Sequence, residues 1–108
     1  MDAQAAFEAR DSFHVVDVRE PFEWELGHVD GSVHIPVQQI QERASELPTD
    51  KPLLCVCMVG IRSEYAANAL AAAGFQTENL EGGLAAWVAN GLPLVKDEVG
   101  EPTVWTPD

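Results

Sequence analysis

Hydrophobic positions gather in four short segments of the chain, and these segments predict β-strands. They cover residues 13–18, 32–35, 53–57 and 75–80. The third segment, Leu-Leu-Cys-Val-Cys, is apolar without a break, which is typical of a strand buried on both faces of a sheet. The chain is therefore expected to contain a strand from the middle of a covered sheet.

Segments before, between and after these strands predict helices over residues 2–10, 22–26 (a short helical or irregular piece), 37–47, 63–73 and 84–90. In the third of them, apolar residues recur every three or four positions, at Val37, Ile40, Ala44 and Leu47. Strands that alternate with helices predict an α/β fold, with a central, mostly parallel sheet flanked by helices on both faces. Binding sites of such sheets lie at the carboxyl ends of the strands.

The chain of 108 residues has the size of one domain, and its hydrophobic fraction of 46% is that of a folded protein. We assign residues 1–95 to this domain. Residues 96–108 form an acidic tail that contains Pro and Gly. This tail is expected either to be flexible or to dock on a surface through Val104 and Trp105.

The charge of the chain excludes several classes of partner. Six basic residues against eighteen acidic ones give a net charge of −12. Such a surface repels phosphate backbones and anionic lipids, so we expect neither a nucleic-acid nor a membrane partner. No apolar run has the length of a membrane span, and the N-terminus lacks the pattern of a secretory signal, so we expect a cytoplasmic protein.

Two cysteines, Cys55 and Cys57, lie in the apolar run. They are too few for a disulfide framework, and no His/Cys cluster has the spacing of a zinc site, so we expect free thiols, no metal and no cofactor. Cys55 lies inside the strand and is interpreted as a core residue. Cys57 lies at its end, before a short loop and the helix that begins near Arg62 and Ser63.

The position of Cys57 favours a reactive thiol. The free N–H groups at the start of the next helix, and the charge of Arg62, stabilise an anion and lower the pKa of a cysteine below its usual value of about 8.5. Gly60 allows the loop to turn its N–H groups inward. A buried core cysteine at the end of a strand is the alternative interpretation.

Four motifs follow one another along the chain, at Asp17–Trp24, Gly27–Pro36, Cys57–Ser63 and Glu81–Trp87. In their order and spacing they resemble the rhodanese-like domain family, whose active-site loop has the pattern C-x-x-G-x-R-S. The resemblance covers about residues 13–94 and implies the α/β fold of that family. It also implies its chemistry, the transfer of a sulfane sulfur.

In that chemistry the Cys57 thiolate takes a sulfur atom from a small donor, thiosulfate or a persulfide, and passes it from a Cys57 persulfide to a thiol or cyanide. The resemblance assigns donor binding to the active-site loop, which comprises Met58, Val59, Gly60, Ile61, Arg62 and Ser63. Asp17 and Arg19 match the D-x-R motif of the family, and we expect them to support the loop as an ion pair. Trp87 and the Gly82-Gly83 turn are expected to serve packing.

The loop departs from the family pattern in one respect. Met58 and Val59 stand where members that act on thiosulfate often carry polar or basic residues. An apolar mouth in an acidic chain predicts weak binding of the thiosulfate dianion, and it favours a persulfide on a less charged molecule or on a partner protein.

Other functions are distinguished by the loop and by its cysteine. The spacing Cys-x4-Arg is one residue shorter than the Cys-x5-Arg loop of phosphatases of this fold, which argues against a phosphatase. Two alternatives stay open. One is a non-catalytic binding or regulatory module, and the other is a redox sensor in which Cys57 pairs with Cys55.

Overall fold

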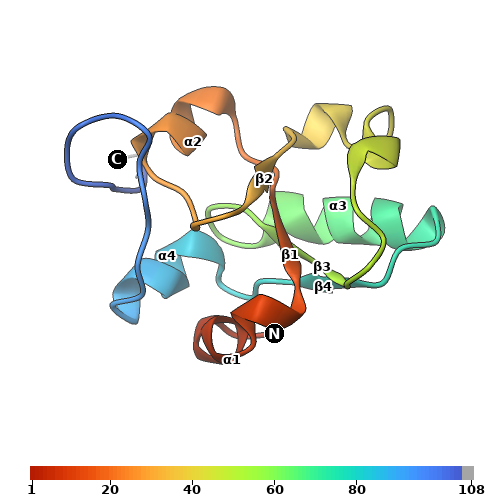
Figure 1. The fold of residues 1–108 in the computed structure, drawn as a ribbon, viewed down its shortest axis with the longest axis horizontal. Coiled ribbons are helices and arrows are strands. Elements are labelled where there is room, and N and C mark those ends of the chain that lie inside the picture. The colour runs from red at the N-terminus through yellow and green to blue at the C-terminus, as the bar shows by residue number, and fades with distance from the viewer. Residues whose placement is uncertain (106–108) are drawn as a thin grey trace.

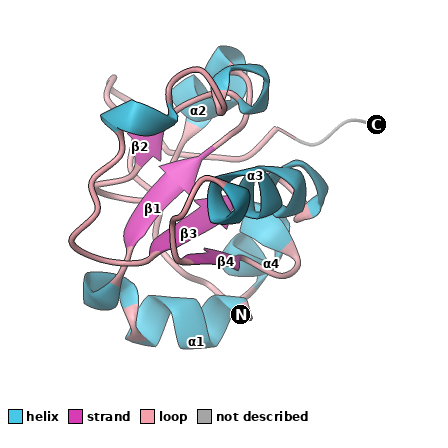
Figure 2. Ribbon diagram, turned by 90° about the vertical axis from the view of Figure 1, so that its right-hand side faces the viewer, coloured by secondary structure: helices cyan, strands magenta, loops and turns pink. Residues whose placement is uncertain are grey.

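The computed structural model describes residues 1–105 and contains a sheet of four parallel strands. The strands are β1 (His14–Asp17), β2 (Val33–His34), β3 (Leu53–Val56) and β4 (Thr77–Asn79), and their order across the sheet is β2-β1-β3-β4. Figure 2 shows them side by side. All four predicted strands are present, each shorter than the segment that predicted it.

Four α-helices accompany the sheet in the described residues: α1 (Ala3–Glu8), α2 (Pro21–Leu26), α3 (Ile61–Ala72) and α4 (Gly83–Ala89). On one face, α3 packs against Val16, Leu53 and Cys55 through Ala66 and Leu70. The opposite face carries α1 and α4 (Figure 1). These findings confirm the predicted α/β fold with a parallel sheet between helices.

Strand β3 owes its central position to its composition. All four of its residues are buried, and they alternate between the two core clusters. Leu53 and Cys55 face α3, whereas Leu54 and Val56 face α1 and α4. The unbroken apolar run therefore places the end of β3, and Cys57 after it, between two covered faces.

The predicted helix over residues 37–47 is wrong. This segment forms two 3₁₀ turns, η2 (Val37–Gln39) and η3 (Ala44–Glu46). Ile40 and Leu47 are nevertheless buried, and Val37 and Ala44 pack against the core partly buried, because the pairs Val37/Ile40 and Ala44/Leu47 are each spaced by three residues, which is one 3₁₀ turn. The N–H groups of Ile40 and Leu47 accordingly bond to the carbonyls of Val37 and Ala44. The spacing of four between the turns imitates a helix in the sequence.

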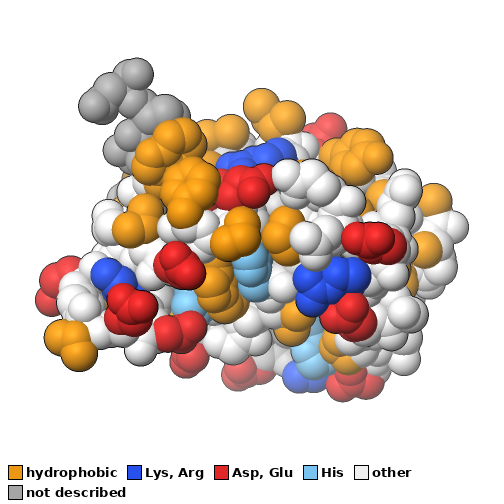
Figure 3. All heavy atoms as spheres, turned by 90° about the horizontal axis from the view of Figure 1, so that it is seen from above, with side chains coloured by type: hydrophobic (Ala, Val, Ile, Leu, Met, Phe, Trp, Pro, Cys, Tyr) orange, Lys and Arg blue, Asp and Glu red, His pale blue; other side chains and the backbone are white. Residues whose placement is uncertain are grey.

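The acidic tail returns to the domain over α2. The Thr103 N–H donates to the Leu26 carbonyl at 2.9 Å, Val104 packs on the α4 side of the core, and the Trp105 ring meets Phe22 edge-on at 5.3 Å. Figure 3 shows hydrophobic side chains gathered beside the end of the chain. The tail prediction also includes residues 106–108, which lie outside the described part.

In residues 1–105, no helix combines the length and the apolar character that crossing a membrane requires.

Candidate active site

Cys57 lies directly after β3, at the carboxyl edge of the sheet, and its residue surface is fully buried. Gly60 follows in the left-handed region with φ of +100°, and α3 begins at the next residue. A side chain at Gly60 would be strained by this φ and would stand 3.3 Å from the Leu80 carbonyl oxygen. The helix thus begins two residues earlier than predicted, and Ile61 lies in its first turn rather than in the loop.

Three donors of the loop and helix point at the sulfur of Cys57. The Gly60 N–H lies 3.1 Å from Sγ, the Ser63 N–H 3.4 Å, and the Ser63 hydroxyl oxygen 3.3 Å. Burial acts to raise the pKa of Cys57, but hydrogen bonds from Ser63, Gly60 and Val59 outweigh it, so that the pKa lies below its ordinary value. The N-terminus of α3, a helix of 12 residues, adds its dipole in the same sense.

Backbone hydrogen bonds attach the loop after β3 to the first turn of α4. The N–H of Leu84 donates to the Cys57 carbonyl at 2.8 Å, and the N–H of Ala85 donates to the Met58 carbonyl at 3.0 Å. Gly83 permits this approach, because a Cβ there would lie 2.4 Å from the Met58 carbonyl oxygen. The Gly82-Gly83 turn therefore positions the loop that carries Cys57.

Arg62 extends from the first turn of α3 and forms a two-pronged ion pair with Glu23 of α2. Its Nη1 and Nη2 atoms lie 2.7 and 3.1 Å from the two carboxylate oxygens of Glu23. The arginine side chain is 34% exposed, whereas the glutamate side chain is only 2% exposed. The charge of Arg62 is thus balanced by a buried partner, and hydrogen bonds to Sγ lower the pKa of Cys57 more than this charge does.

The sequence reasoning did not identify Glu23 as a site residue. Burial acts to raise its pKa, but hydrogen bonds from Arg62 and from the Glu20 N–H lower it. Glu23 is the third residue of α2 and closes a capping box with Glu20, next to Pro21 in the first turn. The sequence signal for Glu23 was the spacing Glu-Pro-x-Glu, which is typical of a helix start. It places Glu23 at the third position of α2.

Asp17 and Arg19 form the ion pair that the sequence predicts, and both side chains are fully buried. Arg19 contacts both carboxylate oxygens of Asp17, at 3.0 Å from Nε and 2.8 Å from Nη2, and Nη2 also donates to the Gly27 carbonyl. Asp17 ends β1, so the pair joins that strand to the turn after α2. Neither residue of the pair contacts Cys57 in the described hydrogen bonds.

Asn79 is a second residue that the sequence reasoning missed. It ends β4, the strand next to β3, and its side chain reaches the site from that edge. Its Oδ1 atom lies 2.5 Å from the Ser63 hydroxyl oxygen, and its Nδ2 atom donates to the Gly60 carbonyl at 3.1 Å. A polar residue at the carboxyl end of a predicted strand was the signal that pointed to it.

The rim of the site is apolar. Val59, Ile61 and Tyr65 are exposed, and Met58 is half-buried beside them. A groove of about 410 Å³ runs next to Arg62 and is lined on its other sides by Val37, Gln38, Ile40, Gln41, Ile61 and Tyr65. Arg62 is the one charged residue in that lining.

Cys55 faces the same core cluster as Cys57 and is likewise fully buried, but its thiol has no polar partner among the described hydrogen bonds. Burial, with a smaller effect of the nearby Cys57, raises the pKa of Cys55 to about 12. Both cysteines are free thiols. Within residues 1–105, no cluster of three or more His, Cys, Asp or Glu side chains could hold a metal ion.

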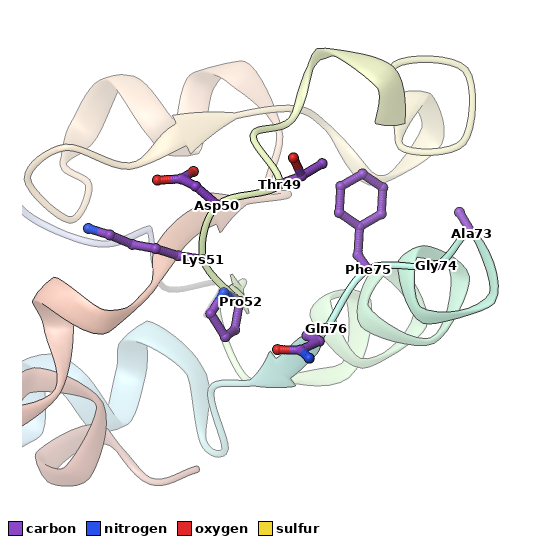
Figure 4. A pocket seen from close by; sticks show the side chains of 8 residues that line it. All are labelled: Thr49, Asp50, Lys51, Pro52, Ala73, Gly74, Phe75 and Gln76. Carbon is purple, nitrogen blue, oxygen red and sulfur yellow. The ribbon is translucent and has the colours of Figure 1, made fainter.

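Another pocket, of about 360 Å³, lies at the opposite edge of the sheet. Its walls precede β3 and β4, at residues 49–52 and 73–76 (Figure 4). This is the amino edge of the parallel strands, away from Cys57. It contains no cysteine or other strong nucleophile, and it is not part of the candidate site.

Comparisons with known proteins agree with this geometry. Residues 2–90 match the Rhodanese-like domain. Among curated proteins, the uncharacterized protein YqhL from Bacillus subtilis is 42% identical over 74 residues, which are 68% of this chain and 59% of YqhL. The thiosulfate sulfurtransferase GlpE from Vibrio cholerae is 33% identical over 93 residues, with 85% of this chain and 87% of GlpE covered.

A solved structure shows the same fold. The crystal structure of a rhodanese-related protein from Thermoplasma volcanium matches with a TM-score of 0.85 and 34% identity, over 88% of this chain and 95% of the other. The chain spans only 59% of the length of YqhL, so similarity to that protein concerns one part of it. The matched family covers most of the present sequence, and this chain therefore belongs to the rhodanese-like domain family.

Proposed function

We propose that this chain is a sulfurtransferase in which Cys57 carries the sulfur. The Cys57 thiolate attacks the outer sulfur of a persulfide donor, a new S–S bond forms, and the donor leaves as its thiolate. An acceptor thiolate then attacks the outer sulfur of the Cys57 persulfide and leaves with it, and the Cys57 thiolate is regenerated. With cyanide as the acceptor, the product is thiocyanate.

The observation that carries this proposal is the set of donors around Sγ. Gly60 and Ser63 supply two N–H groups and a hydroxyl within 3.1–3.4 Å of a sulfur that is otherwise buried. A neutral core thiol gains little from three donors, whereas a thiolate without them would pay the full cost of burial. The arrangement therefore fits an anionic sulfur, which is the nucleophile and also the leaving group of the two half-reactions.

The charges of the site favour a donor of low charge. Glu23 balances Arg62, the rim of Val59 and Ile61 is apolar, and the chain as a whole carries −12. Thiosulfate, with two negative charges, would meet no uncompensated cation at this mouth. We infer that the preferred donor is a persulfide on a small molecule or on a partner protein, and we place the reaction in the cytoplasm, where thiols stay reduced.

The two alternative functions receive less support. A sensor that forms a Cys55–Cys57 disulfide needs a second thiolate, and Cys55 is buried with its pKa raised to about 12. A binding module without turnover gives no role to the donors that surround Cys57.

Mass spectrometry after exposure to a persulfide donor tests the proposal. We expect an adduct of about 32 Da, one sulfur atom, on the wild-type protein and on Cys55→Ala, and none on Cys57→Ser. The adduct should disappear when an acceptor thiol is added. A wild-type protein that stays without the adduct after treatment with a persulfide and with thiosulfate contradicts sulfur transfer and leaves the binding module.

A further inference from the structure

The buried hydroxyl of Ser63 faces two acceptors but has a single proton to donate. Its oxygen lies 2.5 Å from Asn79 Oδ1 and 3.3 Å from Cys57 Sγ. Because one O–H can make one strong hydrogen bond, the two acceptors compete for it. Residue Ser63 is fully buried, so water does not supply the bond that is lost.

The side chain of Asn79 is oriented with its oxygen toward Ser63. Its Nδ2 donates to the Gly60 carbonyl at 3.1 Å, and a rotated amide would place two oxygens against each other there. Asn79 ends β4 in register with Cys55, and this pairing fixes the backbone from which the amide extends. The Oδ1 atom of Asn79 is therefore held in a position where it accepts the proton of the Ser63 hydroxyl.

The charge on Cys57 decides between the two acceptors. When Sγ is a thiol, it can donate its own proton to Ser63 Oγ, and the hydroxyl can donate onward to Asn79, so that every donor is used. When Sγ is a thiolate, it is the stronger acceptor, and the hydroxyl turns toward it. Asn79 then loses its hydrogen-bond donor, a cost that is set against ionisation of the thiol.

We propose that Asn79 is a positioning residue that holds the Ser63 hydroxyl away from Cys57 while the sulfur is neutral and releases it when the sulfur becomes negative. The competition for the hydroxyl proton does not depend on the proposed function. Its use during a reaction does, because the sulfur of Cys57 is a charged thiolate before and after transfer and a neutral inner sulfur in the persulfide. Asn79 would thereby keep the Ser63 hydroxyl hydrogen-bonded in both states, to its own Oδ1 when the sulfur is neutral and to Sγ when the sulfur is charged.

The groups that face this network do not replace Asn79. Cys55 on β3 and Arg62 on α3 are the titratable and charged neighbours of Cys57 for which an interaction with it is described, and Glu23 of α2 lies behind Arg62. Neither Cys55 nor Glu23 contacts the Ser63 hydroxyl in the described hydrogen bonds. The Gly60 carbonyl also accepts the Glu64 N–H at 3.3 Å, so it keeps a donor when Asn79 is shortened.

A double-mutant cycle tests the proposal. The ionisation of Cys57 is followed through the ultraviolet absorbance of its thiolate against pH, with the Cys57→Ser protein as the blank. Asn79→Ala removes the competing acceptor and should raise the ionisation constant of Cys57 about threefold. The same substitution in a Ser63→Ala background should leave that constant unchanged, because no hydroxyl remains to be positioned.

A second variant and a matched control keep the result decisive. Asn79→Asp places a stronger acceptor beside Ser63 and should lower the ionisation constant of Cys57 at least about tenfold. Asn90→Ala, at an exposed asparagine whose Nδ2 bonds the Ala86 carbonyl on α4, should leave it unchanged. The proposal is overturned if Asn79→Ala has no effect or lowers the constant, or if its effect is equal with and without Ser63. The titration needs no sulfur donor, so its failure is distinct from failure of sulfur transfer.

Discussion

Cys55 and Cys57 are two residues apart and face the same core cluster, yet their surroundings drive their thiols in opposite directions. Both are fully buried. Burial, with a smaller effect of Cys57, raises the pKa of Cys55 to about 12, whereas at Cys57 hydrogen bonds from Ser63, Gly60 and Val59 more than cancel burial and lower the pKa. The strand ends between them, and only beyond its end do backbone N–H groups become free to serve a sulfur. The lowered pKa of Cys57 is therefore a consequence of hydrogen-bond donors beyond the end of the strand rather than of exposure.

The contrast between the two cysteines is tested most directly by replacing each of them in turn. Cys57→Ser should abolish transfer of sulfur from a persulfide donor to a thiol, because the carrier atom is lost. Cys55→Ala should retain most of the rate, because that sulfur stays protonated at neutral pH. Steady-state transfer assays on both variants provide the measurement. Loss of activity in both would show that the two thiols act together, as a sensor or relay.

The alkaline stability of the protein measures the state of Cys55. Because its folded-state pKa lies above the ordinary value of 9.0, the neutral thiol favours the folded state fully below about pH 9. That contribution is lost as the pH rises toward 12, by about 1.4 kcal/mol for each pH unit.

Urea unfolding of wild type and of Cys55→Ala is measured at about pH 8 and at about pH 11. The difference between their free energies of unfolding should be about 3 kcal/mol smaller at the higher pH. Cys57→Ala provides the matched control with the opposite trend. The folded-state pKa of Cys57 is lowered, so its contribution is present above the ordinary thiol pKa and is lost as the pH falls through the folded value. Equal trends in both series would refute the contrast between the two cysteines.

The hydroxyl of Ser63 is the side-chain donor that separates the two thiols. Ser63→Ala removes it and should move the titration of Cys57 to higher pH, with sulfur transfer at neutral pH slowed about tenfold. The deficit should close as the pH is raised, because the thiolate then forms without the hydroxyl. A pH–rate profile checks this, and a deficit that is independent of pH would assign Ser63 a purely structural role.

The ion pair of Glu23 with Arg62 sets the charge that a donor meets on the way to Cys57. Glu23→Gln frees the positive charge of Arg62 and should lower the KM for thiosulfate about fivefold, with a smaller effect on a neutral persulfide donor. Glu64→Gln, which makes the same change of charge at an exposed position of α3, is the control. The interpretation fails if both variants change the KM for thiosulfate to the same extent.

The parts of the molecule that depend on local patterns were predictable from the sequence. The four strands and the loop between β3 and α3 follow from apolar runs, whereas the pairing of Asp17 with Arg19 was implied by the resemblance to the D-x-R motif of the family. The helix expected over residues 37–47 failed because i, i+3 spacing suits a 3₁₀ turn as well as an α-helix. A pattern with four apolar anchors does not distinguish the two.

The rest of the site depends on packing between distant segments. Glu23 meets Arg62 across 39 residues of sequence, and Asn79 meets Ser63 across 16. The residues next to Glu23 and Asn79 in the sequence do not indicate that either side chain points into the site. Glu23 reaches the site because α2 lies next to the start of α3, and Asn79 reaches it because β4 pairs with β3. Such contacts require the fold before they can be recognised.

Because Cys57 is fully buried, the sulfur transfer that we propose would select reagents by their shape as well as by their charge. A sulfane sulfur projects as a single terminal atom and can enter a narrow opening ahead of the group that carries it. The bridging sulfurs of a bulky disulfide are flanked by carbon on both sides and meet the rim first. The buried thiol would thus be shielded from mixed-disulfide formation by attack on bulky disulfides, while a terminal sulfane sulfur, the atom that we propose it carries, would still reach it.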